Sequence, residues 1–318
     1  MRLSVLSLGL FLVACGEGFA PTEPLRAPDG AAPDHDTPYV ENSMPPGFAE
    51  AVAAEDVPLE VLVGIAYTET GMQMVQGEEE FEGRAAGFGV MGLRSDMVPL
   101  AAELAGLAEE DVKFDRDANI MAVAALLAEW AAEEGIDTSD VGAWAPVVAR
   151  YSGIENPEGL AEYVHHEVYA AINGGVKLEG FELDATEAEA DYPTPAIDDQ
   201  RTGDSSAVWT RSPNQSSRGS YSPEIVVIHT CEGSYSGCWS WLANSSSGVS
   251  AHYVVNSTGS QVRHLVDEDR KAWHISASYA CSRNDGTLCN RNGVSTNNFS
   301  VGIEHAGYGS QSSWNAGL

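Results

Sequence analysis

A histidine and a glutamate each stand at the end of an expected strand in the last third of the chain. Residues 225–228 are four consecutive β-branched residues, which predict a buried strand covered on both faces, and His229 follows them directly. Residues 299–304 form another expected strand, which ends on Glu304. A strand end on a rigid sheet suits a bound ligand or metal. His229 alone is also consistent with a core histidine whose hydrogen bonds are satisfied.

Two more histidines lie between these strands. His252 falls inside an expected strand at residues 249–255, and His274 ends the segment Lys271-Ala-Trp-His. We interpret His252 as a core residue, and His264 and His305 as surface or packing residues. A zinc site made from His229 with His252 or His305 is the alternative.

Four segments carry a family resemblance: Ile228-His-Thr, Val249-Ser-Ala-His-Tyr-Val-Val, Lys271-Ala-Trp-His and Asn298-Phe-Ser-Val-Gly-Ile-Glu. In this order they resemble the zinc-dependent N-acetylmuramoyl-L-alanine amidases, a family of phage amidases, bacterial recycling amidases and animal peptidoglycan-recognition proteins. The resemblance implies an α/β amidase domain over residues 223–318, with a central mixed β-sheet flanked by helices. It also implies that peptidoglycan is the substrate.

The same resemblance implies a Zn²⁺ ion held by three protein ligands and a water. His229 matches the first ligand, whereas the other two, a His and an Asp or Cys, lie in a C-terminal segment of the family. No histidine follows His305, so we expect a truncated chain or a fragment. Glu304 would carry the proton from the zinc-bound water to the leaving amine of L-alanine. His274 and Trp273 would line the substrate cleft; a structural His274 packed on Trp273 is the alternative.

Four cysteines in this region predict disulfides, because an even number suits an oxidising compartment. Of the three pairings, we favour Cys231–Cys238 and Cys281–Cys289, since each closes a small loop. The first pair also resembles the disulfide of the recognition proteins. A four-thiolate zinc site is the competing interpretation, although no spacing is Cys-x-x-Cys.

The N-terminus has the composition of an export signal. Arg2 supplies a positive charge, and residues 3–13 are apolar but too short to span a membrane. Leu12-Val-Ala-Cys15 resembles the lipobox of bacterial lipoproteins, which makes residues 1–15 the signal peptide and lipobox and places lipid on Cys15. We therefore expect an exported lipoprotein, anchored to a membrane in the periplasm or at the cell surface. An ordinary secretory signal is the alternative, and residues 16–45, rich in Pro, Ala and Asp, predict a flexible tether.

Residues 46–177 show helical periodicity without evident strands, which predicts an all-α domain. Four of its segments, in order, resemble the goose-type lysozymes and lytic transglycosylases: Ile65-Ala-Tyr-Thr-Glu-Thr-Gly, Ala86-Gly-Phe-Gly-Val-Met-Gly-Leu, Asp115-Arg-Asp-Ala-Asn-Ile-Met and Ala149-Arg-Tyr-Ser-Gly. The resemblance implies that Glu69 is the general acid of glycosidic-bond cleavage and that Tyr151 binds substrate. An apolar helix end raises the pKa of a glutamate, as this role needs.

Two departures keep a second interpretation open for this domain. Gly92 and Ser152 stand where the lysozyme-like family has a Gln and an Asn of the sugar-binding groove. A domain that binds the glycan without cutting it is therefore the alternative.

The net charge of −31 is confined to the first 200 residues, because residues 201–318 hold eight basic and eight acidic side chains. No basic face is available to neutralise phosphates, so we exclude a nucleic-acid partner. Residues 178–222 are acidic and proline-bearing, then polar, which predicts a linker.

The sequence as a whole predicts a multi-domain lipoprotein that degrades peptidoglycan. Its lysozyme-like domain would address the glycan strand and its amidase domain the stem peptide. A non-catalytic peptidoglycan-binding lipoprotein is the alternative.

Overall fold

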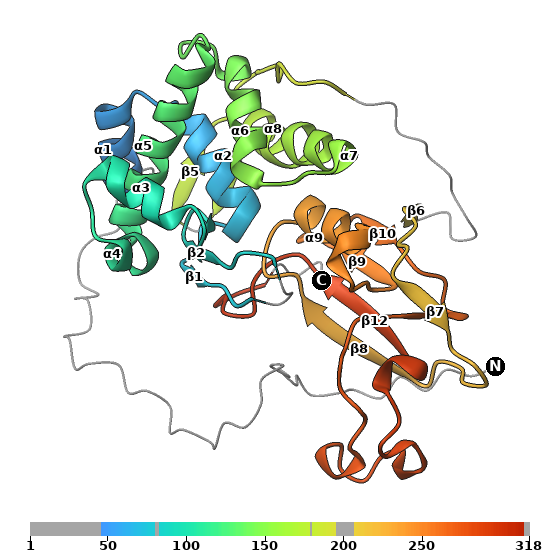
Figure 1. Ribbon diagram of the computed structural model, residues 1–318. Coiled ribbons are helices and arrows are strands. Elements are labelled where there is room, and N and C mark those ends of the chain that lie inside the picture. Colours follow the sequence, from blue (N-terminus) through green and yellow to red (C-terminus); the bar gives the residue numbers. More distant parts are fainter. Residues whose placement is uncertain (1–45, 80–82, 179, 195–206, 315–318) are drawn as a thin grey trace, which may run out of the picture. The chain divides into compact units, whose positions relative to one another are not determined.

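The computed structural model describes residues 46–79, 83–178, 180–194 and 207–314 (Figure 1). The expected signal peptide, Cys15 and the tether at residues 16–45 lie outside the described residues. Among the helices that are described, none is long and apolar enough to cross a membrane. Ile275–Thr296 forms a compact unit of its own, and the other described residues form the second unit.

The N-terminal part of the second unit is mainly helical. Glycines in the left-handed conformation end several of its helices, among them Gly71, Gly106, Gly135 and Gly153. Asp115 starts the longest helix, because its side chain accepts a hydrogen bond from the Ala118 N–H at 2.9 Å. The elements are α1 (Pro46–Glu55), α2 (Leu59–Thr70), α3 (Val98–Ala105), α4 (Glu109–Phe114), α5 (Arg116–Glu134), η1 (Val141–Trp144), α6 (Ala145–Ser152), α7 (Pro157–Ala161), the π-helix η2 (Glu162–Val168) and α8 (Tyr169–Gly174).

Two small antiparallel sheets accompany these helices, so the prediction of an all-α domain is wrong in this respect. Strands β1 (Val75–Gln76), β2 (Gly87–Gly89) and β3 (Leu93–Arg94) form one, and β4 (Val176–Leu178) with β5 (Phe181–Leu183) forms the other. Strands of two or three residues are too short to show an alternating pattern. Glycine-rich β2 also lacks the side chains that favour strands.

The C-terminal part is built on a mixed five-stranded sheet with the order β6-β10-β9-β12-β8. β12 runs parallel to both of its neighbours, β9 and β8, whereas β9 and β10 are antiparallel. The central mixed sheet expected for an α/β domain is therefore confirmed. The strands are β6 (Ala207–Trp209), β8 (Ile225–Thr230), β9 (Tyr253–Val255), β10 (Val262–His264) and β12 (Ser300–His305), while β7 (Gln215–Ser217) pairs separately with β11 (Arg270–Ala272).

A helix covers only one face of this sheet within the described chain. Helix α9 (Tyr235–Leu242) packs with Val254 of β9 in a common apolar core. Strand β8 lies at the sheet edge, where Val226 and Ile228 are 48% and 55% exposed. The predicted covering of β8 on both faces is therefore wrong. A run of β-branched residues indicates a strand but cannot show how many of its faces are covered.

The expected linker at residues 178–222 is folded at both ends. Strand β5 belongs to the β4–β5 hairpin, and β6 and β7 each pair with a strand of the C-terminal part. The linker prediction is corrected for these segments, whereas residues 195–206 lie outside the described ranges. Three-residue strands with small polar side chains, such as β7, gave no strand signal in the sequence.

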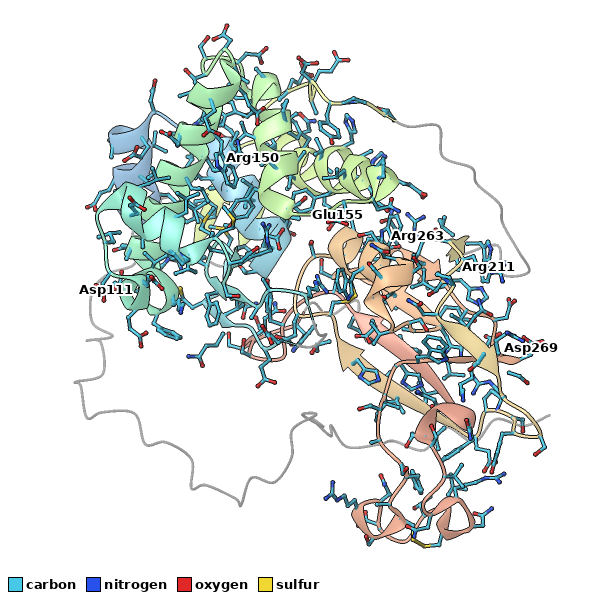
Figure 2. All side chains as sticks on the ribbon, viewed as in Figure 1. Asp111, Arg150, Glu155, Arg211, Arg263 and Asp269 are labelled. Carbon is cyan, nitrogen blue, oxygen red and sulfur yellow. A yellow bond between two sulfur atoms is a disulfide. The ribbon has the colours of Figure 1, made fainter. Side chains whose placement is uncertain are left out.

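The structure contains both of the local disulfides favoured from the sequence (Figure 2). Cys281–Cys289 closes the Ile275–Thr296 unit between two 3-10 helices, η4 (Cys281–Arg283) and η5 (Cys289–Arg291). Cys231–Cys238 joins the end of β8 to helix α9. All four sulfurs are paired, so the alternative of a four-thiolate zinc site is wrong.

Candidate active site

Strands β8 and β12 bring His229 and Glu304 to the same face of the sheet. The parallel register pairs these two residues directly, and paired residues of neighbouring strands point to the same side. His305 follows Glu304 and therefore points to the opposite face. The alternative zinc site from His229 and His305 is thus wrong, because the two imidazoles lie on different sides of the sheet.

His274 lies against His229 on this face. Its Nδ1 is 3.1 Å from Nε2 of His229, and its Nε2 is 2.8 Å from the hydroxyl oxygen of Ser300. The ring packs onto β12 at Gly302, where a Cβ atom would stand 2.3 Å from the imidazole. Burial lowers the pKa of His229 to about 4 and lowers the pKa of His274 well below its usual range. Both rings are therefore neutral near pH 7, and a neutral imidazole can bind a metal.

The other aromatic candidates near this site are held by structural contacts. His252 is fully buried, its Nδ1 accepts a hydrogen bond from the Gly302 N–H at 2.9 Å, and its Nε2 lies 2.6 Å from the guanidinium group of Arg218. These contacts agree with the core interpretation of His252 and argue against its use in a zinc site. The indole N–H of Trp273 donates to the Ser216 hydroxyl at 3.0 Å.

His229 fits one ligand position of the zinc ion that the resemblance implies, since it is neutral and stands at a strand end. Cys231, Cys238 and Glu304 also place possible ligand atoms within 4.8 Å of one another. The two sulfurs are joined in a disulfide, however, and do not bind a metal as thiolates. The described residues therefore supply one ligand that matches the family, and they contain no counterpart of its other two.

Glu304 is fully buried next to the Cys231–Cys238 disulfide. The Cys231 N–H donates to the His305 carbonyl at 2.8 Å, which fixes the start of the disulfide loop against β12. The disulfide and β12 thus hold this carboxylate in one place, on the sheet face that carries His229.

A second candidate site lies at the C-terminal end of α2, where the chain leaves the helix through Gly71. Glu69 is 9% exposed, and burial raises its pKa to about 7, although Tyr163 and the guanidinium groups of Arg84 and Arg94 act in the opposite direction. A glutamate with a pKa of about 7 keeps its proton at mildly acidic pH and in about half of the molecules at pH 7, so it can serve as a general acid there.

Segments on which the resemblance to lysozymes was based meet around this helix end. The Tyr151 hydroxyl donates to the Met91 carbonyl at 2.7 Å, and the Asn119 side chain accepts from the Met91 N–H at 2.8 Å. Arg94 donates to the Tyr151 carbonyl. Tyr151 is 5% exposed and its hydroxyl is bonded to the main chain, so it holds the loop before β3. Its contact with substrate stays a prediction.

Gly92 has a structural reason to be glycine. Its φ is +63°, and a Cβ atom at this position would lie 2.9 Å from the Cβ of Glu69. The backbone of the β2–β3 turn therefore approaches the candidate acid more closely than a Gln at this position would allow.

We expect Gly92→Ala to lower the free energy of unfolding by about 2–4 kcal/mol, from backbone strain and overpacking together. Gly106→Ala is the matched control, because Gly106 has a φ of +66° and no atom within 4 Å of its added Cβ. The control should lose only the strain, about 1–2 kcal/mol. Urea denaturation measures the free energy of unfolding of both variants. Equal losses of stability would show that the close contact with Glu69 does not destabilise Gly92→Ala.

Sequence reasoning missed three residues that support these sites, of which Arg218 and Ser300 are buried and Arg84 is half-buried. Arg84 donates to the Cys231 carbonyl at 2.8 Å, and Arg218 donates to the carbonyls of Glu268 and Asn297. Ser300 contacts His274, as described above. One signal was available for Arg84, which is a lone basic residue just after an acidic run in the sequence.

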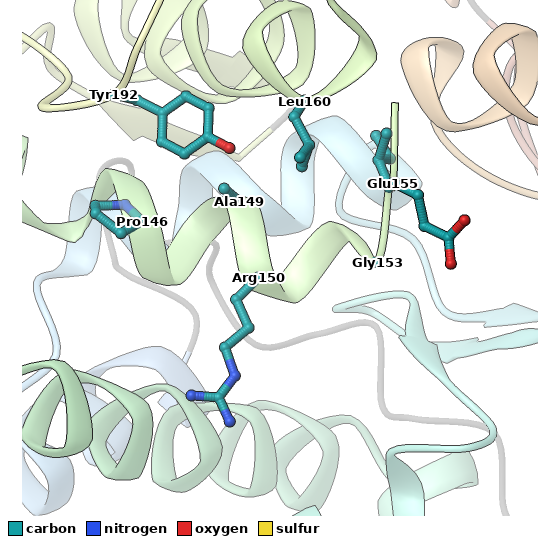
Figure 3. A pocket seen from close by; sticks show the side chains of 8 residues that line it. Pro146, Ala149, Arg150, Gly153, Glu155, Leu160 and Tyr192 are labelled. Carbon is teal, nitrogen blue, oxygen red and sulfur yellow. The ribbon is translucent and has the colours of Figure 1, made fainter. Parts of the chain in front are cut away.

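Helix α6 also borders a shallow pocket of about 410 Å³ (Figure 3). The ring of Tyr192 and the side chain of Leu160 lie on the Ala149 side of the helix, whereas Arg150 points away from them. The sequence-predicted site residues are absent from its lining, which consists of Pro146, Ala149, Arg150, Gly153, Ile154, Glu155, Leu160 and Tyr192. We assign no chemistry to it.

Comparison with known proteins gives a family match for the C-terminal part. Residues 219–317 match the family described as N-acetylmuramoyl-L-alanine amidase. N-acetylmuramoyl-L-alanine amidase A of Achromobacter lyticus is 32% identical over 114 residues, which are 35% of this chain and 54% of that protein. The chain thus spans about half the length of this curated relative. Together, the family match and the relative support the amidase family for this part.

A solved structure shows a weaker likeness. The crystal structure of a Se-Met AmpD derivative is 20% identical, with a TM-score of 0.26 over 39% of this chain and 72% of that chain. This likeness carries no further argument.

Proposed function

We propose that this protein is a peptidoglycan hydrolase whose C-terminal part cleaves the amide bond between N-acetylmuramic acid and L-alanine with the help of zinc. The family match and the Achromobacter relative support peptidoglycan amidase activity. The observation that carries the proposal is the arrangement of His229, His274 and Glu304 on one sheet face, all within the matched residues.

The reaction is the addition of water to the lactyl carbonyl carbon, followed by breakage of the carbon–nitrogen bond. Zinc, when bound, lowers the pKa of a water molecule and polarises a carbonyl group. His229 would be one of its ligands. Glu304 would take the proton from the attacking water and pass it to the departing nitrogen of L-alanine. The products are a free carboxylate on muramic acid and a free α-amine on the peptide.

The helical part would address the glycan strand of the same polymer. The raised pKa of Glu69, about 7, leaves the carboxyl protonated at mildly acidic pH and partly protonated at pH 7, which suits protonation of the leaving glycosidic oxygen. We further propose that the protein is exported and anchored through lipid on Cys15, as the sequence of its first residues suggests.

Purified sacculi test the amidase directly. The full chain in zinc-containing buffer should release new α-amino groups of L-alanine, and a chelator should stop their release until zinc is restored. His229→Ala should remove the release of α-amino groups and leave sacculus binding intact. New sugar ends that form in the presence of chelator would report the separate activity of the helical part.

The opposite result would identify a binding protein. If the chain stays on the sacculi but releases no α-amino groups when zinc is abundant, the amidase proposal fails. Glu69→Gln, measured in parallel, should affect only the formation of sugar ends.

A further inference from the structure

Residues 307–313, which follow β12 and which we call the strap, run from the C-terminal part to the end of helix α2 within the same compact unit. The beginning of the strap is fixed to the C-terminal part. The Gly307 N–H donates to the Gly233 carbonyl at 2.8 Å, and the Gly309 N–H donates to the carboxylate of Glu232 at 2.7 Å. The strap therefore leaves the sheet in a set direction.

The far end of the strap is bonded to the chain that follows α2. The side-chain oxygen of Gln73 accepts from the N–H groups of Ser312 at 3.0 Å and Ser313 at 3.2 Å. The amide group of Gln73 also donates to the Ser313 carbonyl at 3.1 Å, and the Gln76 N–H donates to the Ser310 hydroxyl at 3.0 Å. One glutamine side chain of the helical part thus holds two successive residues of the strap.

Tyr308 is the strap residue that reaches the Glu69 site, and it is only 2% exposed. A Cβ atom added at Gly92 would lie 3.3 Å from the Tyr308 hydroxyl oxygen and 2.9 Å from the Cβ of Glu69, so the phenol and the glutamate border the same point. A Cβ atom added at Gly87 would overlap the phenol hydroxyl. Two glycines of the β2–β3 region therefore leave the space that the phenol fills.

This arrangement conflicts with direct access of a sugar chain to Glu69. A general acid must lie within hydrogen-bond reach of the atom that it protonates, so a glycosidic oxygen needs the space beside the carboxyl. Glu69 is 9% exposed, and the Tyr308 ring occupies space at its side. Burial, and next the negative charge of Glu69, raise the pKa of the Tyr308 phenol, which agrees with their proximity.

We propose that the strap is an autoinhibitory cover: Tyr308 fills the space beside Glu69, and a glycan strand reaches the carboxyl only when the strap moves away. The inference rests on the proposed function, because it takes Glu69 as the acid of glycan cleavage. The hydrogen bonds of Gln73 stabilise the covered state, so they lower the fraction of molecules that can bind glycan at any moment.

Glycan binding tests the cover without any cleavage when it is measured in a full chain that carries Glu69→Gln. The probe is a preparation of glycan strands freed of their stem peptides. Adding Gln73→Ala removes the hydrogen bonds that hold the end of the strap and should tighten binding by about 10-fold. Gln261→Ala is the matched control, because Gln261 is an exposed glutamine just before β10. Equal affinities for the two variants would overturn the proposal.

Substitution of the phenol tests the cover by activity. Tyr308→Ala opens the space beside Glu69, so the full chain should form sugar ends on sacculi about 10-fold faster than the wild type. Tyr308→Phe keeps the ring and should stay near the wild-type rate. If both variants form sugar ends more slowly than the wild type, Tyr308 serves the glycan site and does not block it. Gln73 is half-buried and lies outside the core, so its variant still tests the cover if Tyr308→Ala does not fold.

Hydrogen exchange separates this proposal from the proposed function. The N–H groups of residues 309–313 should exchange faster when glycan strands bind the full chain, because the strap then leaves its partners. Faster exchange in a chain that forms no sugar ends, even with Tyr308→Ala, would refute glycan cleavage and leave the cover standing. Sugar ends that depend on Glu69 but form at the same rate with Gln73→Ala and with Tyr308→Ala would refute the cover alone.

Discussion

Glu304→Gln should lower the rate of amide hydrolysis by about 10²- to 10⁴-fold and leave binding to sacculi unchanged. The substitution keeps the size of the side chain but removes the oxygen that accepts a proton. Glu304 is fully buried, and β12 holds it on the sheet face of His229, so no other carboxylate of that strand can replace it. The readout is the release of L-alanine α-amino groups from sacculi at a fixed zinc concentration.

Two further variants make this test specific. Glu224→Gln is the control, since Glu224 is exposed just before β8 and should keep full activity. Glu304→Asp retains a carboxylate but withdraws it by one methylene, so it should bind sacculi and hydrolyse the amide slowly. A Glu304→Gln variant that folds and retains activity within a few-fold of the wild type would remove Glu304 from the mechanism.

The positions of the candidate site residues could be predicted from the sequence better than the contacts that surround them. The sequence placed His229 and Glu304 at the ends of expected strands, and the strands β8 and β12 form where they were expected. The contact between His229 and His274 could not be predicted, because it depends on a ring that packs over Gly302 from a distant loop. Such a contact is set by tertiary structure, which local patterns do not encode.

The predictions from the sequence that were wrong concern short strands and the solvent exposure of side chains. β1 to β3 contain two or three residues each and are held by long-range contacts, such as the Asn119 side chain that accepts from the Met91 N–H. The exposure of Val226 and Ile228 could not be predicted from the sequence, because β-branched residues favour strands whether the face is exposed or covered. The roles of Arg84 and Ser300 could be recognised only from their contacts in the structure, with the Cys231 carbonyl and with His274 respectively.

Glu69→Gln should strongly slow glycan cleavage by the helical part and also stabilise the fold at alkaline pH. The folded-state pKa of Glu69 is about 7, above its ordinary value of 4.5. Below pH 4.5 the carboxyl is protonated in both states. Between pH 4.5 and 7 the unfolded chain releases this proton while the folded chain keeps it, so stability falls as the pH rises. Above pH 7 the loss is complete, at roughly 3 kcal/mol.

The glutamine side chain of the Glu69→Gln variant cannot ionise, so this loss disappears. Urea denaturation should give equal stabilities at pH 4 and a variant more stable than the wild type by up to roughly 3 kcal/mol at pH 8. Glycan cleavage in the wild type should decline as the pH rises through about 7, because the acid loses its proton. Below pH 7 the variant should form sugar ends about 10²- to 10⁴-fold more slowly than the wild type, and this difference should narrow at higher pH.

Glu167→Gln separates stability from catalysis. Burial also raises the pKa of Glu167 to about 7, and its carboxylate accepts from the Ser236 N–H at 3.0 Å. This variant should therefore be more stable than the wild type at pH 8, although the weakened hydrogen bond to Ser236 offsets part of the gain in the free energy of unfolding. It should still cleave glycan. If both variants lose glycan cleavage equally, the effect comes from the buried charge in general. If Glu69→Gln alone loses it, proton donation by Glu69 is the cause, because only this carboxyl stands at the end of α2 beside the β2–β3 turn.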